Sequence, residues 1–153
     1  MSENKVIMLH TGSAVETEKL GEQIGKRLRG GEVIELVSDL GGGKTTFVRG
    51  LARGFGSAAH VSSPTFTISQ EYKAGGRTLY HFDFYRLHEA GIMADELAEA
   101  AHDPNAVVVV EWGDIVADVL PADCVTITIK AITEQERIFE FAYPAHLEYL
   151  LPA

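Results

Sequence analysis

The stretch EVIELVSDLGGGKTTFVRGLAR, residues 32–53, decides how the rest of the chain is organised. An apolar, β-branched strand leads into consecutive glycines at 41–43, and a helix then begins with Lys44, Thr45 and Thr46. Backbone N–H groups converge on phosphate oxygens only where no Cβ blocks the approach, which is the condition that glycine meets. The order of strand, glycine loop and helix therefore predicts a phosphate cradle.

Each residue after the glycines has a role in such a cradle. Lys44 would reach the β and γ phosphates, Thr45 would offer its hydroxyl to Mg²⁺, and the helix would add the positive pole of its dipole. The alternative is a glycine-rich turn followed by an unrelated lysine, but the strand before and the helix after favour a nucleoside triphosphate site.

Ser38 departs from the strict pattern G-x-x-x-x-G-K-[ST], which has glycine at this position. The serine is either accepted at modest cost or narrows the mouth of the loop and weakens nucleotide binding. The sequence leaves both outcomes open.

Length and composition predict a single domain over residues 1–153, with 46% hydrophobic and 23% charged residues. Cys124 is the only cysteine, so no internal disulfide can form, and we expect a buried, inert thiol. No apolar run approaches the roughly 18 residues of a membrane span, so a cytoplasmic protein without membrane contact is expected. The net charge of −9 argues against direct binding of nucleic acid, which relies on Lys and Arg.

The flanking segments alternate between strand and helix patterns. A short strand is expected at 6–9, and Ser13 with Glu16 forms a capping box that opens a helix. Leu20, Ile24 and Leu28 recur at helical spacing, and the glycines at 30 and 31 end that helix. Further on, the patterns predict a hairpin with its second strand at 78–83, a helix at 87–101, a buried central strand at 106–110, antiparallel strands at 125–130 and 137–143, and a short helix at 145–151.

Two acidic residues end predicted strands. Glu111 follows the most buried strand and Asp83 ends the hairpin strand. Because ligands of parallel sheets lie outside the carboxyl ends of the strands, either carboxylate could hold Mg²⁺ through water or orient the water that attacks the γ-phosphate. The alternative for both is an ordinary solvated acid at a strand end.

Other polar groups are compatible with a nucleotide site but do not require one. The loop S-S-P-T at 62–65 could sense the γ-phosphate or form an ordinary turn, and Arg86 could stabilise transferred charge or pair with a surface acid. Trp112 could flank the nucleotide or pack in the core. The six histidines show no zinc-site spacing, and we interpret most of them as surface or packing residues.

The ordered motifs DLGGGKTTFVRGLARGFG, VSSPTFT, HFDFYRL and VVEWG resemble the bacterial TsaE family, also known as YjeE. They cover about residues 32–113. The resemblance implies an α/β fold of P-loop NTPase type, a three-layer sandwich with a central, mostly parallel sheet and antiparallel additions. It also implies a small, slow ATPase that uses ATP and Mg²⁺ and works with TsaB and TsaD to make threonylcarbamoyladenosine beside the anticodon of tRNAs, contacting tRNA only through the complex.

The resemblance also implies roles for individual positions. Asp83 and Glu111 match the family's important acids, Thr65 lies in its switch-like loop, and Trp112 matches a family aromatic. Glu111 joins Thr45 as a Mg²⁺ residue, Lys44, Asp83 and Glu111 form the catalytic set, and Arg137 approaches the nucleotide base. The residues that wrap the phosphates are Asp39, Leu40, Gly41, Gly42, Gly43, Lys44, Thr45 and Thr46.

Two other functions remain open at this point. A small-molecule kinase uses the same cradle, although no segment here carries the arginine-rich lid that such an enzyme needs. A nucleotide-sensing interaction module would bind ATP without hydrolysing it, with Ser38 as the cause.

Overall fold

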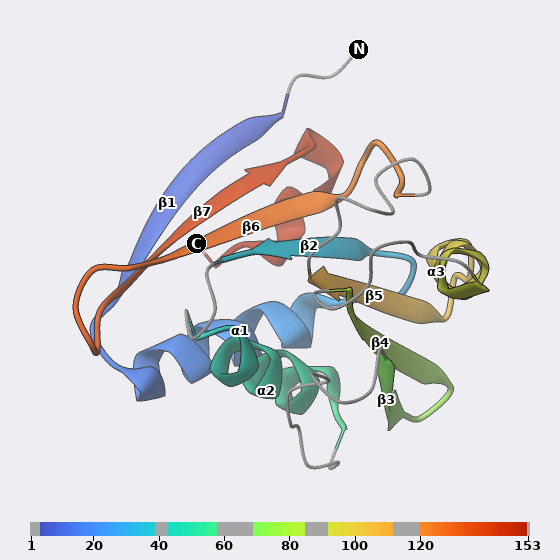
Figure 1. Ribbon diagram of the computed structural model, residues 1–153, viewed down its shortest axis with the longest axis horizontal. Coiled ribbons are helices and arrows are strands. Elements are labelled where there is room, and N and C mark those ends of the chain that lie inside the picture. Colours follow the sequence, from blue (N-terminus) through green and yellow to red (C-terminus); the bar gives the residue numbers. More distant parts are fainter. Residues whose placement is uncertain (1–3, 39–42, 58–68, 85–91, 112–119, 153) are drawn as a thin grey trace.

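The computed structural model describes residues 4–38, 43–57, 69–84, 92–111 and 120–152. Strands and helices alternate through the first two thirds of the chain, apart from one pair of consecutive strands, and three strands and a short helix follow (Figure 1). In chain order the elements are β1 (Lys5–Thr11), α1 (Ala14–Arg27), β2 (Val33–Val37), α2 (Lys44–Phe55), β3 (Ser69–Ala74), β4 (Arg77–Asp83), α3 (Ile92–Ala101), β5 (Ala106–Glu111), β6 (Val125–Ala131), β7 (Arg137–Tyr143) and the 3-10 helix η2 (Ala145–Leu150).

The strands form one seven-stranded sheet in the order β1-β7-β6-β2-β5-β4-β3. The central strands β6, β2, β5 and β4 run parallel, whereas the β1–β7, β6–β7 and β3–β4 pairs are antiparallel. The expected α/β fold is therefore confirmed, with a mixed sheet whose parallel part lies in the centre and whose antiparallel pairs lie toward both edges.

Helices cover the sheet on both faces, which gives the three layers (Figure 1). The larger core lies between one face of the sheet and α1, α2 and η2. The smaller core lies on the opposite face, where α3 packs through Leu97 and Ala100. Because side chains alternate along a strand, Val107 and Val109 of β5 face the larger core and Val108 and Val110 face the smaller one. All four are fully buried, as expected for the run that the sequence placed in a central strand.

Helices α1 and α2 approach each other more closely than large side chains would allow. A Cβ at Gly50 would lie 2.1 Å from the backbone oxygen of Glu18, and one at Gly21 would lie 2.3 Å from that of Phe47. Gly25 and Gly54 face similar backbone contacts. Glycines spaced i, i+4 on both helices thus permit the close packing that fixes α2 on the sheet.

The start of α1 follows the sequence prediction. The Ser13 hydroxyl accepts the N–H of Glu16 at 3.2 Å, and the Glu16 carboxylate accepts the N–H of Gly12 at 2.9 Å. The side chain of Glu16 therefore reaches back one residue further than in the usual capping box. Later in α1, Glu18 pairs with both Arg49 and Arg53, which lie four residues apart and share one face of α2.

The end of α1 differs from the sequence prediction. The helix ends at Arg27, and Leu28 is the extended C-cap residue, buried but outside the helix. The chain turns early because the buried carboxylate of Glu32 accepts the N–H groups of Arg29 and Gly30 at 2.8 and 2.7 Å. The hydroxyl of Tyr149 also donates to Glu32, at 2.6 Å, so one carboxylate ties the end of α1 to η2.

Other predictions need smaller corrections. The first strand is longer than residues 6–9, and the last helix is a 3-10 helix. Helix α3 begins at Ile92, so the predicted start at 87 lies outside the described residues. Cys124 is half-buried, and burial together with the nearby Glu35 raises the pKa of its thiol, which favours the unreactive form. Of the described residues, none belongs to a helix long and apolar enough to cross a membrane.

Candidate functional site

The N-terminus of α2 is built differently from that of α1. Gly43 is the N-cap residue in the left-handed conformation, with φ 98°, and it offers the helix no side-chain cap. The first turn of α2 also contains no acidic residue, whereas α1 has Ser13 and Glu16 in these roles. Among the described residues, a helix start with no side-chain cap from its N-cap residue and no acid in its first turn favours an anion at this point.

Lys44, the first residue of α2, is buried against the end of β5. Its Nζ lies 3.2 Å from Oε1 of Glu111, and the two side chains are only 9% and 5% exposed. Glu111 ends the buried strand β5, as the sequence predicted, and β5 is parallel to β2, which leads into the glycine loop. The fold thus brings together the lysine and one of the two acids that sequence reasoning selected.

His81 is a third member of this cluster, and the sequence interpretation missed it. The imidazole is fully buried, and its Nε2 hydrogen-bonds to Oε2 of Glu111. The sequence interpretation described most of the histidines as surface or packing residues and gave His81 no part in the site. The available signal was the alternation of β4, because His81 lies two residues before Asp83 and therefore on the same face of the sheet.

The cluster keeps Glu111 ionised. Burial alone would raise the pKa of Glu111, but the hydrogen bond from His81, the charge of His81 and the charge of Lys44 outweigh burial. The pKa of Glu111 is therefore held below the ordinary glutamate value. A buried carboxylate that stays charged can serve as a ligand for a cation or its water shell.

Asp83 and Thr45 lie near the same end of the sheet. Asp83 is the last residue of β4 and pairs in register with Glu111 on the neighbouring parallel strand. Thr45 and Thr46 occupy the first turn of α2, and both are half-buried, as is Ser38 just after β2. The carboxyl ends of β2, β4 and β5 thus gather the predicted acids around the start of α2.

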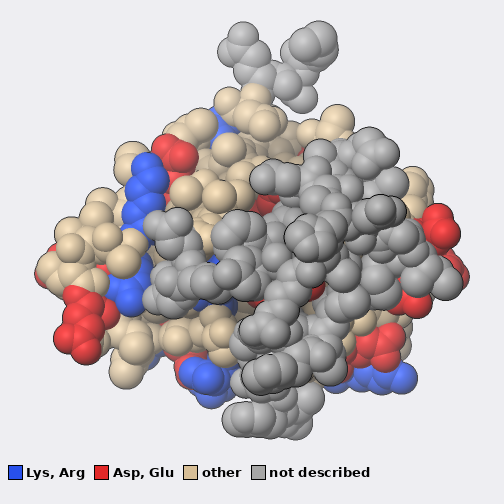
Figure 2. All heavy atoms as spheres, in the orientation of Figure 1, with Lys and Arg blue, Asp and Glu red and all other residues tan. Residues whose placement is uncertain are grey.

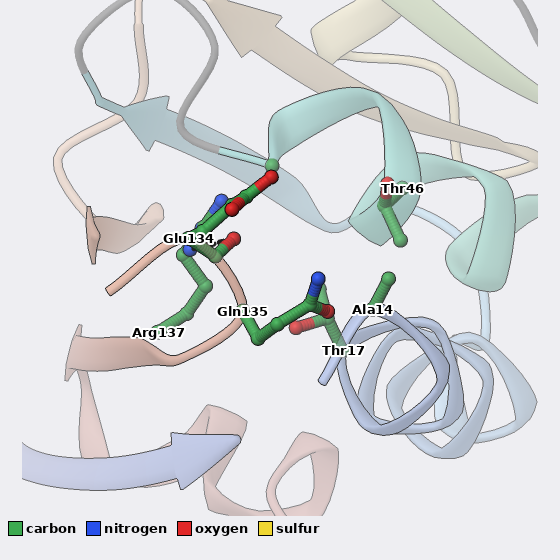
Figure 3. A pocket seen from close by; sticks show the side chains of 7 residues that line it. Ala14, Thr17, Thr46, Glu134, Gln135 and Arg137 are labelled. Atoms are coloured by element: carbon green, nitrogen blue, oxygen red, sulfur yellow. Dashed lines mark hydrogen bonds between the residues drawn. The ribbon is translucent and has the colours of Figure 1, made fainter. Parts of the chain in front are cut away.

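Arg137 reaches this region from the start of β7. A Cβ at Gly43 would lie 3.4 Å from Nε of Arg137, and the guanidinium donates to the backbone oxygens of Thr133 and Glu134. Beside it lies a cavity of about 40 Å³ between the β6–β7 turn and the starts of both helices (Figure 3). Its lining residues are Ala14, Thr17, Gly43, Thr46, Glu134, Gln135 and Arg137. The contact of Arg137 with a nucleotide base stays a prediction.

Several predicted site residues lie outside the described part of the chain. They are Asp39, Leu40, Gly41 and Gly42 of the loop, Thr65 with the rest of residues 62–65, and also Arg86 and Trp112. The predictions made for them therefore stay predictions.

The groups gathered at the start of α2 are of the kinds that bind Mg²⁺ and phosphate. No group of three or more His, Cys, Asp or Glu side chains that could hold a metal occurs among the described residues. Mg²⁺ usually takes few protein ligands and completes its shell with water and substrate phosphates. One ionised carboxylate, the Thr45 hydroxyl and a helix N-terminus that begins with a lysine match this requirement.

The described surface on one face of the molecule carries charges of both signs. Figure 2 shows Lys and Arg side chains interspersed with Asp and Glu around the described part of this face. The net charge of −9 opposes the binding of a polyanion by charge alone.

Comparison with known proteins gives a consistent result. The family model described as threonylcarbamoyl adenosine biosynthesis protein TsaE matches residues 11–139. A tRNA threonylcarbamoyladenosine biosynthesis protein TsaE from Treponema pallidum is 40% identical over 82% of this chain and 92% of its own length. The protein of the same name from Bacillus subtilis is 36% identical over 90% and 85%. The crystal structure of Bacillus subtilis YdiB superposes with a TM-score of 0.76 at 31% identity, covering 98% of this chain and 94% of that one. The resemblance inferred from the motifs is confirmed, and the chain belongs to the TsaE family.

Proposed function

We propose that this protein binds ATP with Mg²⁺ at the N-terminus of α2 and hydrolyses it slowly. The observation that carries the proposal is the buried pair of Lys44 and Glu111 at a glycine-initiated helix without a side-chain cap. A buried ion pair is weak evidence for stability, because desolvation offsets much of its Coulomb energy. At such a helix end, the pair is explained instead by function, because Lys44 would bind phosphate and Glu111 would bind a cation.

Each described residue of the proposed site would have a separate role. Lys44 would exchange Glu111 for phosphate oxygens, and Glu111 and Thr45 would then face the cation. Bound Mg²⁺ would neutralise charge on the β and γ phosphates. Asp83, in register with Glu111, would orient water or hold the hydration shell, and Arg137 would lie beside the base. Hydrolysis by the isolated protein should be slow, because we identify no arginine finger among the described residues that would stabilise the transferred charge.

In the cell, we propose a role in threonylcarbamoyl modification of the adenosine next to the anticodon, in tRNAs that read codons beginning with A. The names of the relatives from Treponema pallidum and Bacillus subtilis support this pathway. The partners would be TsaB and TsaD in the cytoplasm, with tRNA contacted through their complex. The acidic net charge supports an indirect rather than a direct contact with tRNA.

Calorimetry with Lys44→Ala tests the nucleotide site. A hydrogen bond to a charged group is worth about 1.5–3 kcal/mol, so ATP affinity should fall about 10- to 100-fold. Lys26→Ala is the matched control, because Lys26 is an exposed lysine on α1 that pairs with Glu22 at 3.4 Å. Equal ATP affinity of Lys44→Ala and the wild type would refute the phosphate cradle.

Reconstitution tests the pathway. Threonylcarbamoylation of tRNA by TsaB and TsaD should depend on this protein and on ATP. A modification rate that is indifferent to its addition would exclude the proposed role, and ATP binding without phosphate release in the full mixture would indicate a nucleotide-dependent module rather than an ATPase.

A further inference from the structure

His81 occupies a position where an apolar residue would be expected. It lies on β4 beside Val109 of β5, and Leu79, two residues earlier on the same face, belongs to the larger core. The residue is 0% exposed, so the ring is enclosed by packed neighbours and has little freedom to rotate. Burying an imidazole here costs free energy unless its polar atoms are paired.

Glu111 is the polar partner that offsets this cost. Nε2 of His81 hydrogen-bonds to Oε2 of Glu111, and since an ionised carboxylate only accepts, Nε2 carries the hydrogen. The other ring nitrogen, Nδ1, is buried and has no hydrogen-bond partner among the described residues. Within this part of the chain, the hydrogen bonding of the histidine is thus directed entirely at Glu111.

The two oxygens of Glu111 have different partners. Oε1 faces Lys44 at 3.2 Å, and Oε2 faces His81. Lys44 sits on a long, flexible stem and has phosphate as an alternative partner, whereas His81 is fixed in the sheet. If Lys44 turned to a nucleotide phosphate, the bond to His81 would remain and would keep the carboxylate from rotating.

We propose that His81 is a positioning residue, which holds Glu111 in the orientation that accepts magnesium when the nucleotide binds. The inference rests on the proposed function, since it assigns Glu111 to the cation. Residues that hydrogen-bond a metal-binding carboxylate from behind typically change metal affinity or activity 10- to 100-fold when they are replaced. His81 would therefore determine how strongly Mg²⁺ raises the affinity for nucleotide, and it would not change the affinity for nucleotide in the absence of Mg²⁺.

The test measures this coupling directly, without turnover. The affinity for the non-hydrolysable analogue AMP-PNP is determined by calorimetry in excess Mg²⁺ and in EDTA, and the ratio of the two is the coupling factor. His81→Phe keeps a buried ring but removes the donor, and His81→Gln restores an N–H at a similar reach. His146→Phe is the matched control, because His146 pairs with Asp123 at 3.3 Å in an exposed position outside the cluster.

The coupling factor of His81→Phe should fall about 10-fold or more, with affinity in EDTA unchanged. His81→Gln should recover most of the factor, and His146→Phe should match the wild type. If His81→Phe does not fold, His81→Asn takes its place as the variant that lacks the bond to Glu111. The asparagine amide is one methylene shorter than the glutamine amide of His81→Gln and therefore falls short of the carboxylate.

Two results would overturn the inference. A wild-type coupling factor in His81→Phe would show that Glu111 needs no such support. Equal losses in Mg²⁺ and EDTA, without recovery in His81→Gln, would show a role in packing alone. Failure of the wild type to bind AMP-PNP at all would instead refute the proposed function, so the two failures are distinguishable.

Discussion

Substitution of Gly50 by alanine tests the close packing that holds α2 in place. Helix propensity alone predicts a gain, because alanine in a helix interior is favoured over glycine by about 1 kcal/mol. The structure predicts a loss. The added Cβ would lie 2.1 Å from the backbone oxygen of Glu18 and 2.9 Å from the backbone nitrogen of Glu22.

The magnitude follows from the kind of atoms involved. Backbone atoms of a packed helix cannot change rotamer, so the two helices must separate by about 1 Å before the contact is tolerable. Overpacking of a core costs about 1–3 kcal/mol, and a backbone clash belongs at the upper end of that range. After the gain in propensity is subtracted, about 2 kcal/mol of destabilisation remains.

Thermal unfolding followed by circular dichroism measures this loss. For a protein of this size, about 2 kcal/mol corresponds to a decrease in Tm of about 4–8 °C. The matched control is Gly76→Ala, because a Cβ at Gly76 meets nothing within 4 Å. That variant should be unchanged or slightly more stable, since alanine restricts the unfolded chain.

The separation of the helices should also affect the site, because α2 carries Lys44 at its first position. We therefore expect Gly50→Ala to bind AMP-PNP more weakly than Gly76→Ala. A Tm of Gly50→Ala at or above that of the wild type would refute the reasoning, since it would mean that α1 and α2 do not pack at this distance.

Two further predictions concern buried carboxylates. The folded state holds the pKa of Glu111 below the ordinary value of 4.5. The ionised carboxylate therefore stabilises the fold above pH 4.5, and this stabilisation is lost as the pH falls through the pKa of the folded state. Urea unfolding of Glu111→Gln should therefore change less than that of the wild type between about pH 6 and pH 3, and an equal change in both would contradict the lowered pKa. Glu32→Ala should cost about 3 kcal/mol in urea unfolding, because two backbone N–H groups and the Tyr149 hydroxyl lose their acceptor. Tyr149→Phe removes one of these bonds and should cost less; an equal cost would mean that the backbone contacts contribute nothing.

Local patterns predicted most of the elements because they act over a few residues. The capping box at Ser13 and Glu16, the buried run of β5 and the strand before the glycine loop all depend on neighbours in sequence. The end of α1 was predicted less well. Its position depends on Glu32, a carboxylate beyond the helix, and on a contact with η2 from the end of the chain.

The site likewise combines features that local patterns predict with contacts that depend on residues far apart in sequence. Lys44 and Glu111 were selected because strand ends and glycine loops have known roles in parallel sheets. Their direct pairing required the neighbouring positions of β2 and β5, which lie far apart in sequence. His81 was overlooked because the alternation of β4 places it on the same face as Asp83 but does not show which side chain it contacts. Its meaning appears only when β4 lies beside β5 and places the imidazole against Glu111.

The sequence by itself determined the class of fold and the family, because both are encoded by contiguous motifs and their order, and it predicts phosphate binding at residues 41–46. Only the tertiary structure decided which charged groups meet, how closely α1 packs on α2, and that a buried histidine faces the acid opposite Lys44. The physical reason is that burial, strand register and helix separation are set by chain segments far apart in sequence. Burial, register and separation in turn determine which polar groups are removed from water and therefore need a hydrogen-bond or ion-pair partner within the protein.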